Sequence, residues 1–282
     1  MQPILDLWWV FPAAVVFSTV AISSGVSGAL FFSPFFLLVV GLDPAQAVGA
    51  GLLTEVFGMG NGLRSYVRQR VVDYATARWL LAGAVPSIAA GALLAHAVPA
   101  RTLKVVFGAG LLLLAVFMLF VPTPQTSEEM EPTHGSIERH SRGKGTTVIS
   151  SADGEVYEYP TCWRLPGVLM AVAGGALTGM ISAGLPEITT SQLVLRCRMP
   201  ARVAIATSIF TLAIAAVVGA AIHAFSATPV WRVVAWSIPG VLVGSTIGSR
   251  VSKHLPGPLM EKVLGVVFAA VGVLVLVLEF AR

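Results

Sequence analysis

Long apolar runs separated by short polar segments make up most of the chain. These runs cover residues 7–40, 44–63, 75–98, 105–121, 165–195, 203–225, 230–249 and 263–278. Most of them match the roughly 20 residues that a helix needs to cross a hydrocarbon core of about 30 Å. The pattern therefore predicts an all-α integral membrane protein.

The composition agrees with this prediction. Hydrophobic residues are 56% of the chain and charged residues only 11%, whereas charged residues are about a quarter of an ordinary soluble domain. The formal net charge of +4 comes from Lys and Arg at the ends of apolar runs, where such residues set membrane topology. We therefore expect membrane lipid around the chain and no nucleic-acid partner.

The two halves of the chain repeat each other in three proline-anchored blocks. "PAQAVGAGLL" pairs with "PARVAIATSIF", "AVPSIAAGALL" with "SIPGVLVGSTI", and "PARTLKVVFG" with "PGPLMEKVLG", in the same order and at offsets of 153–157 residues. Chance similarity between apolar segments is the alternative. Three blocks in register favour an internal duplication.

A polar segment at residues 122–163, rich in Pro, Gly, Ser and charge, separates these halves. We therefore divide the chain into a first membrane repeat (1–121), a linker (122–163) and a second membrane repeat (164–282). Within the linker, "TTVIS" and "EVYEY" flank Asp153-Gly154, which is a turn signal for a small β-hairpin that would be stable only against a partner surface. A plain connector is the simpler interpretation of the linker, and a functional loop is the alternative.

The positions of Lys and Arg discriminate between two topologies. If each half had four spans, the 18 cations would divide ten to eight between the two faces. If the first run of each half instead enters the membrane and returns as a hairpin, each half has three spans and the repeats are inverted. One face then holds 14 cations and the other face only four. These four are Arg101, Lys104, Arg232 and Arg282. The positive-inside rule favours this second arrangement in the cytoplasmic membrane, with the linker in the cytoplasm and both termini outside.

Small residues interrupt the first apolar run of each half, in "SSGVSGALFFSP" (23–34) and "GMISAGLPEITTS" (179–191). As one straight helix, residues 7–40 would be about 51 Å long, more than one span needs, so two arms of about 15 residues are expected. Irregular backbone at membrane depth is tolerated only where protein or a wet cavity surrounds it. Half-helix N-termini at such breaks bind anionic substrates in transporters, although close helix packing is the alternative. The predicted substrate-binding residues of the breaks are Ser23, Ser24, Gly25, Ser27, Gly28, Ser182 and Gly184.

Two acidic residues fall inside apolar runs. Glu187 follows Pro186 at the second break, and Glu55 lies 11 residues into the run that begins at Pro44. A carboxylate at the membrane centre costs about 2.5 to 3.5 kcal/mol, so it usually faces a cavity or a partner. We predict proton coupling at both residues; the alternatives are a helix-terminus contact for Glu187 and a buried hydrogen bond for Glu55.

Other chemistry is not indicated. The two cysteines, Cys162 and Cys197, are too few for a disulfide framework, and we assign them no role. Neither a metal-binding spacing nor a nucleophile with a base is found, so no metal, no cofactor and no enzymatic activity are expected. His96 and His223 fall near the outer ends of spans, where anchoring at the membrane interface is the default interpretation.

The sequence resembles the TauE/SafE family of membrane proteins, often called sulfite exporters. The similar segments are "SGVSGALFFSPFFLLVVGLDPAQAVGAGLL", "RSYVRQRVVDYATAR", "AVPSIAAGALLA", "PEITTSQLVLRCRMPARVAIATSIF" and "IPGVLVGSTIGSRV". The resemblance implies secondary transport of small sulfur-containing anions such as sulfite or organosulfonates. By motif position it adds Thr207 and Ser208 to the site, whereas the first half has Ala50 and Gly51 at the matching positions.

The sequence thus predicts a secondary transporter with a small anion and protons as its partners. The substrate site would lie at the two breaks near the membrane midplane. An anion channel, or a membrane scaffold without coupled transport, is the alternative. A homo-oligomer is compatible with the sequence.

Overall fold

Ten α-helices, one 3-10 helix and one β-hairpin make up the part of the chain that the computed structural model describes, residues 4–24, 27–120, 145–226, 231–251 and 257–280. The first half contains the 3-10 helix Ile4–Leu7 and the helices α1 (Val10–Ser24), α2 (Ala29–Leu38), α3 (Pro44–Gln69), α4 (Tyr74–Ala97) and α5 (Ala100–Phe120). The second half contains the strands β1 (Thr146–Ser150) and β2 (Val156–Pro160) and the helices α6 (Arg164–Ile181), α7 (Leu185–Cys197), α8 (Ala201–Ser226), α9 (Trp231–Val251) and α10 (Gly257–Phe280). The mostly helical fold agrees with the predicted all-α class.

Helix length and composition agree with a membrane protein. Among the described residues, α4, α5, α6 and α8 are the four helices long and apolar enough to cross a membrane. Large apolar side chains on these helices point outward; Leu113 is 58% exposed and Val217 is 52% exposed, as expected of lipid-facing positions. The helix α6, with 18 residues, is longer than the arm of about 15 residues expected of a hairpin.

Helix breaks occur at both places where the sequence predicts them. The helix α1 ends at Ser24 and α2 begins at Ala29, while α6 ends at Ile181 and α7 begins at Leu185. At the second break the backbone has positive φ at Ser182 (59°) and Gly184 (122°). A left-handed residue of this kind ends a helix by turning the chain, so α7 starts in a new direction. We call α1–α2 the first hairpin and α6–α7 the second hairpin.

The helices of the two halves pack in matching pairs. The helix α1 contacts α9 and α6 contacts α4; α2 contacts α3 and α7 contacts α8. The helix α3 also contacts its counterpart α8, and α5 contacts its counterpart α10. These main contacts are therefore unchanged when the two halves are exchanged, which is what a duplicated chain predicts.

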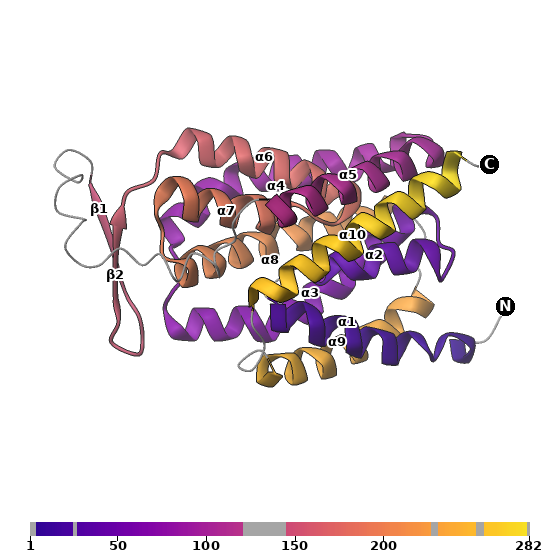
Figure 1. Cartoon of the computed structure of the whole chain (residues 1–282), viewed down its shortest axis with the longest axis horizontal. Helices are drawn as coiled ribbons and strands as arrows, with labels where there is room; N and C mark the ends of the chain where they lie inside the picture. The colour runs from indigo at the N-terminus through magenta and orange to yellow at the C-terminus, as the bar shows by residue number, and fades with distance from the viewer. Residues whose placement is uncertain (1–3, 25–26, 121–144, 227–230, 252–256, 281–282) are drawn as a thin grey trace.

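The two hairpins start at opposite ends of the molecule. Figure 1 shows the β-hairpin and the start of α6 at one end, which we call the linker face. The start of α1 and the end of α10 lie at the other end, which we call the terminal face. The break of each hairpin consequently lies inside the helical bundle.

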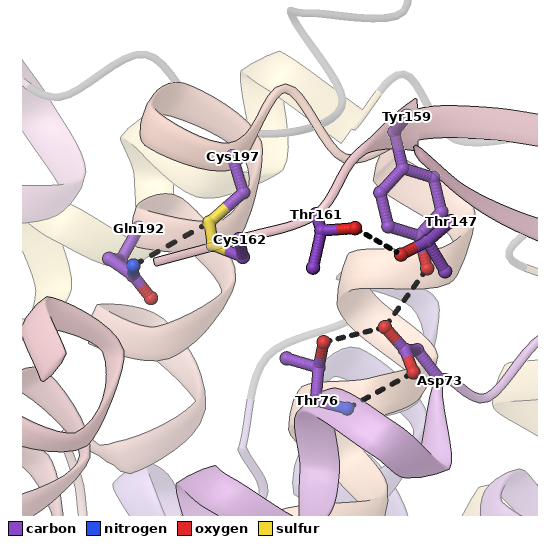
Figure 2. The surroundings of a disulfide bond; sticks show 8 residues. All are labelled: Asp73, Thr76, Thr147, Tyr159, Thr161, Cys162, Gln192 and Cys197. Atoms are coloured by element: carbon purple, nitrogen blue, oxygen red, sulfur yellow. Dashed lines mark hydrogen bonds between the residues drawn. A yellow bond between two sulfur atoms is a disulfide. The ribbon is translucent and has the colours of Figure 1, made fainter. Parts of the chain in front are cut away.

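The β-hairpin packs against the helices at the linker face. Its strands pair antiparallel from Thr146 with Pro160 to Ser150 with Val156. The hydroxyl of the buried Tyr159 donates a hydrogen bond to Oδ2 of Asp73, 3.0 Å away, at the start of α4 (Figure 2). Burial and the neighbouring Asp73 raise the pKa of Tyr159, so the phenol stays protonated and keeps this bond.

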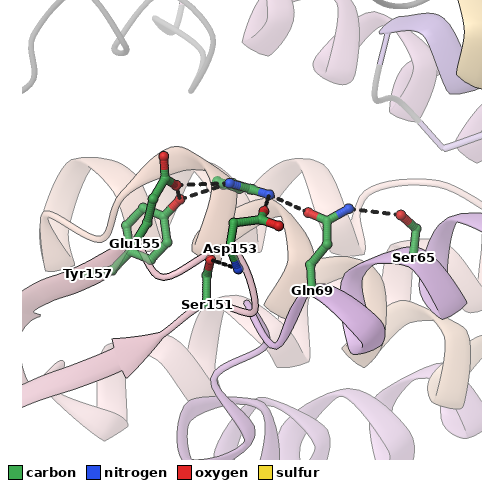
Figure 3. A network of polar contacts seen from close by, with 7 residues as sticks. Ser65, Gln69, Ser151, Asp153, Glu155 and Tyr157 are labelled. Carbon is green, nitrogen blue, oxygen red and sulfur yellow. Dashed lines mark hydrogen bonds and ion pairs between the residues drawn. The ribbon is translucent and has the colours of Figure 1, made fainter.

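Arg202, in the first turn of α8, joins the hairpin to both halves. Its guanidinium pairs with Asp153 at 3.1 Å and with Glu155 at 3.0 Å. It also donates to Oε1 of Gln69 at 2.6 Å, at the end of α3. Figure 3 shows Asp153, Glu155 and Gln69 gathered around this group together with Tyr157. The β-hairpin expected within the linker thus forms at residues 146–160 and is docked on the helices of both halves.

A disulfide bond joins Cys162 to Cys197, with Cα atoms 5.1 Å apart (Figure 2). Assigning these cysteines no role was wrong. The pairing depends on the second hairpin, which returns the end of α7 to the start of α6.

Candidate functional site

The N-terminus of α2 faces a carboxyl group from α3. The hydroxyl of Ser27 donates a hydrogen bond to Oε1 of Glu55, 2.5 Å away. The backbone of Gly28 and Ala29 also interacts with this carboxyl group. Glu55 is only 2% exposed. Since the first amides of a helix lack backbone partners and carry partial positive charge, Glu55 occupies the anion-binding end of α2.

The N-terminus of α7 faces a carboxyl group of its own. The backbone N–H of Gly184 donates to Oε2 of Glu187 at 3.0 Å. The hydroxyl of Thr178, on α6, accepts the N–H of Leu185 at 2.9 Å. Glu187 thus makes the helix-terminus contact that was the alternative to proton coupling, just as Glu55 makes a buried hydrogen bond.

Ser27 connects the two acidic residues. Its hydroxyl bonds Glu55, and its backbone interacts with the carboxyl group of Glu187. The two carboxyl groups also interact electrostatically with each other. The two breaks, 156 residues apart in the repeat, therefore meet at one polar site inside the bundle.

Each carboxyl group leaves one oxygen without a partner. Among the described residues, Oε2 of Glu55 and Oε1 of Glu187 are buried and accept no hydrogen bond. A buried polar atom without a partner costs free energy, and the cost is larger for a charged group. The site would therefore be relieved by a proton on either oxygen or by a ligand that supplies a donor.

Ser182 links the second break to α2. Its hydroxyl forms a hydrogen bond with the hydroxyl of Ser33, and both residues are completely buried. A Cβ atom at Gly51 on α3 would collide with Oγ of Ser33. The absence of a hydroxyl residue at Gly51 thus makes room for this link between the halves.

The remaining predicted residues of the first break are less informative. Gly28 has φ of −65°, an ordinary helical value that other residues adopt. Ser23 and Ser24 fall in the last turn of α1, but their side chains lie outside the described part. Gly25 also lies outside the described residues.

Family resemblance added Thr207 and Ser208 to the site. In the described structure, neither hydroxyl forms a hydrogen bond with a residue of the two breaks. The hydroxyl of Thr207 accepts the N–H of Asp73 at 3.0 Å, so it supports the turn between α3 and α4 near the linker face. Ser208 is buried with no hydrogen-bond partner for its hydroxyl among the described residues. A motif position places a residue on a helix without giving the direction of its side chain.

His223 is not an interface anchor. It is 2% exposed, and its Nε2 lies 2.9 Å from the carbonyl oxygen of Gly179 on α6. Because a carbonyl only accepts, Nε2 carries the proton. The Nδ1 atom lies 3.0 Å from Nε2 of the half-buried His96. A chain of hydrogen bonds thus runs from His96 to the last turns of α6, and sequence analysis missed it because the two histidines are 127 residues apart.

No group of three or more metal-binding side chains occurs in the described residues. The chemistry of the site is that of two carboxyl groups, two helix N-termini and a few hydroxyls. This arrangement can exchange protons and can bind a small oxyanion.

Comparison with known proteins identifies the family. Residues 10–275 match the family model described as sulfite exporter TauE/SafE. The probable membrane transporter protein YunE of Bacillus subtilis (strain 168) is 22% identical over 263 residues, which cover 92% of each chain. The probable membrane transporter protein YjnA of the same organism is 24% identical over 84% of this chain and 87% of its own. No solved structure matches the chain.

A third relative covers a shorter stretch. The probable membrane transporter protein ORF9 of Sinorhizobium sp is 29% identical over 38% of this chain. The family match extends over both broken hairpins and the helices that pack around them. The chain therefore belongs to the TauE/SafE sulfite exporter family of membrane transporters rather than to any class of enzyme.

Proposed function

We propose that this transporter carries small sulfur-containing oxyanions, sulfite or organosulfonates, in a proton-coupled cycle. The observation that carries the proposal is that both half-helix N-termini already hold a carboxyl group, Glu55 at α2 and Glu187 at α7. The description of the family as sulfite exporters supports the choice of substrate.

The carboxyl groups mark where a substrate oxyanion would bind. Helix N-termini attract anions through unpaired amides and the helix dipole. A sulfonate presents oxygen acceptors of the same kind as a carboxylate. We therefore expect the substrate to compete with Glu55 and Glu187 for the donors around Ser27 and Gly184.

Protonation removes this competition. A protonated carboxyl group no longer repels an anion, and it gains an O–H donor of its own. The unpartnered oxygens of Glu55 and Glu187 are the atoms on which a proton would sit. Anion and proton would then enter the site together, and loss of the proton would drive the anion out.

The arrangement of the hairpins supports alternating access. The exchange symmetry of the main helix contacts and the opposite starting points of the hairpins (Figure 1) support inverted repeats, in which one bundle rocks against the other around a central site. We place the linker face in the cytoplasm and both termini outside. Tags at the termini should be accessible from outside, and a tag at Gly143 only from the cytoplasm; accessibility of all three from one side would contradict this topology.

Flux into proteoliposomes tests the function. Saturable accumulation of sulfite or of a sulfonate, driven by a pH gradient and absent from protein-free liposomes, is expected. Flux that does not saturate would instead indicate an anion channel. Complete absence of flux, with the protein correctly folded, would favour a membrane scaffold.

A further inference from the structure

The disulfide closes the base of the second hairpin. Cys162 lies two residues before α6 begins, and Cys197 is the last residue of α7. The ring that the disulfide closes therefore contains all of α6, the break with Ser182 and Gly184, and all of α7. The chain has only these two cysteines, so the first hairpin has no such cross-link.

We propose that the Cys162–Cys197 disulfide is a reducible staple on the second hairpin, opened by a dithiol reductant, and that its opening loosens the break that carries Glu187. The part of this proposal that concerns transport rests on the function proposed above. The part that concerns thiol exchange and hairpin mobility does not.

The surroundings of the two sulfur atoms favour one direction of attack. Cys162 is partly exposed, whereas Cys197 is 4% exposed. An incoming thiolate would attack Sγ of Cys162, and Sγ of Cys197 would leave as a thiolate. Nε2 of Gln192 lies 3.7 Å from Sγ of Cys197 (Figure 2), and this donor would stabilise the charge that develops on the leaving sulfur.

The rest of the exchange is balanced by the reductant. Its second thiol attacks its own sulfur in the mixed disulfide and releases Cys162, so the dithiol becomes a disulfide. Two electrons pass to the protein, and each cysteine sulfur ends as a thiol after taking up a proton.

Gln192 can donate to Sγ of Cys197 because its side chain lies between the two arms of the second hairpin. It is 6% exposed, and its Oε1 atom has no partner among the described residues. A Cβ atom at Gly167 on α6 would lie 3.7–3.8 Å from the amide of Gln192. The amide therefore packs between the two arms, where its donor group contacts the cross-link.

Loss of the disulfide would leave the arms joined through contacts near the tip. A Cβ atom at Gly174 would lie 2.8 Å from Cα of Leu185, so α6 and α7 approach closely there. At the base, the arms would keep their packing, such as that of the Gln192 amide near Gly167, but would lose the covalent link between them. Because α7 begins at the break, movement of its far end would be transmitted to Gly184 and Glu187.

The position of the disulfide suits regulation. The distribution of Lys and Arg places the linker face in the cytoplasm, where dithiol systems keep most cysteines reduced. A cross-link on that face would respond to the redox state of the cell. On an oxidising face it would be permanent.

Thiol labelling tests the exchange in the full-length protein. Purified protein should bind no maleimide reagent before treatment with dithiothreitol and two per chain afterwards. Gln192→Met keeps the size of the side chain and removes the donor, so it should slow reduction severalfold. Gln69→Met is the matched control and should reduce at the wild-type rate, because the side chain of Gln69 bonds Ser65 and Arg202 and neither cysteine among the described residues.

Amide hydrogen exchange tests the mechanical consequence. Reduction should speed exchange severalfold at residues 178–190 and leave α2 unchanged. The double variant Cys162→Ser/Cys197→Ser should show the fast exchange without reductant and no further response to it. Resistance of the native disulfide to dithiothreitol, or unchanged exchange at residues 178–190 after reduction, would overturn the proposal.

Transport is measured separately on the same samples. Reduction should change sulfonate flux severalfold in the wild type and leave the double variant unaffected. Faster amide exchange without flux of any sulfur oxyanion would refute the proposed function. It would not contradict the proposal that reduction of the disulfide loosens the second hairpin. Wild-type flux that is indifferent to reduction, despite faster exchange, would contradict the regulatory role.

Discussion

The two helix breaks meet in one site but are built differently. The second break is capped from within, because Glu187 and Thr178 both belong to the second hairpin. At the offset of 156 residues that relates Pro44 to Pro200, the first hairpin has Phe31 and Ile22 at these positions. The first break therefore has neither cap and takes its carboxyl group from Glu55 on the neighbouring helix α3.

This difference determines which of the two carboxyl groups can lose its helix N-terminus when the helices move. Glu187 travels with α7 and stays at its own helix terminus. Contact between Glu55 and α2 is kept only while α2 and α3 hold their relative positions. At the offset of 156 residues, one less than the offset that matches Ala50 and Gly51 to Thr207 and Ser208, the position of Glu55 in the second repeat is Thr211. The hydroxyl of Thr211 bonds back to the carbonyl of Thr207 at 2.8 Å. The site thus has one fixed acidic residue and one whose partner can be withdrawn.

The largest effect is expected at Gly184, where the backbone has φ of 122° against −65° at Gly28 in the first break. Gly184→Val places a β-branched residue at φ of 122°, with its Cβ 3.1 Å from Cβ of Leu177, and should abolish transport while the protein still inserts. Gly28→Ala is the matched control, because Gly28 has φ of −65° and room for a Cβ atom. Wild-type flux in the valine variant would return Gly184 to a packing role.

Ser27→Ala tests whether Glu55 depends on the first break. It removes the hydroxyl that bonds Glu55, at a cost of about 1.5–3 kcal/mol for a bond to a charged group. The loss applies while Glu55 is ionised, so thermal unfolding should show a larger deficit at high pH than at low pH. Ser27→Thr keeps the hydroxyl and serves as control; a deficit independent of pH would contradict an ionisable role for Glu55.

Thr178→Val tests whether the second break is capped from within. It leaves the N–H of Leu185 buried without its acceptor, which should cost about 1–3 kcal/mol of stability. Thr178→Ser retains the hydroxyl and should be nearly neutral. Chemical unfolding measures both variants, and equal stability of the valine and serine variants would remove Thr178 from the cap.

The smallest effect is expected at Ser182, where the two hairpins touch. Ser182→Ala removes the hydrogen bond to Ser33 and should weaken anion binding by about 0.5–1.5 kcal/mol. Isothermal titration with a sulfonate measures this loss, and Ser33→Ala should give a similar value. A large loss for one variant and none for the other would show that the pair does not act as a unit.

Much of the architecture followed from the sequence, because membrane segments and their breaks are local features. Apolar run length predicted the helices, and clusters such as Ser23–Gly28 and Ser182–Gly184 located both breaks. The partners of each polar group were not predictable in the same way. Ser27 bonds Glu55 only because α2 folds back onto α3. The residues next to Ser27 in the sequence do not predict this partner.

The errors have the same physical origin. Cys162 and Cys197 pair because the second hairpin brings the end of α7 to the start of α6. His223 was assigned to the interface by its depth along α8, whereas its exposure depends on α4 and α6, which cover it. Thr207 was placed in the site by motif position, which did not predict that its hydroxyl accepts the N–H of Asp73.

The most direct test of the account is the pH dependence of anion binding. A simple sulfonate such as methanesulfonate is the suitable probe, because its own charge is constant from pH 5 to pH 8. In the wild type its affinity should rise as pH falls, by up to about tenfold per pH unit for each coupled proton. Glu55→Gln and Glu187→Gln should each bind at least as tightly at pH 8 with a shallower pH dependence, and the double variant should show none. A double variant with the wild-type pH dependence would contradict the claim that these two buried carboxyl groups couple protons to the anion.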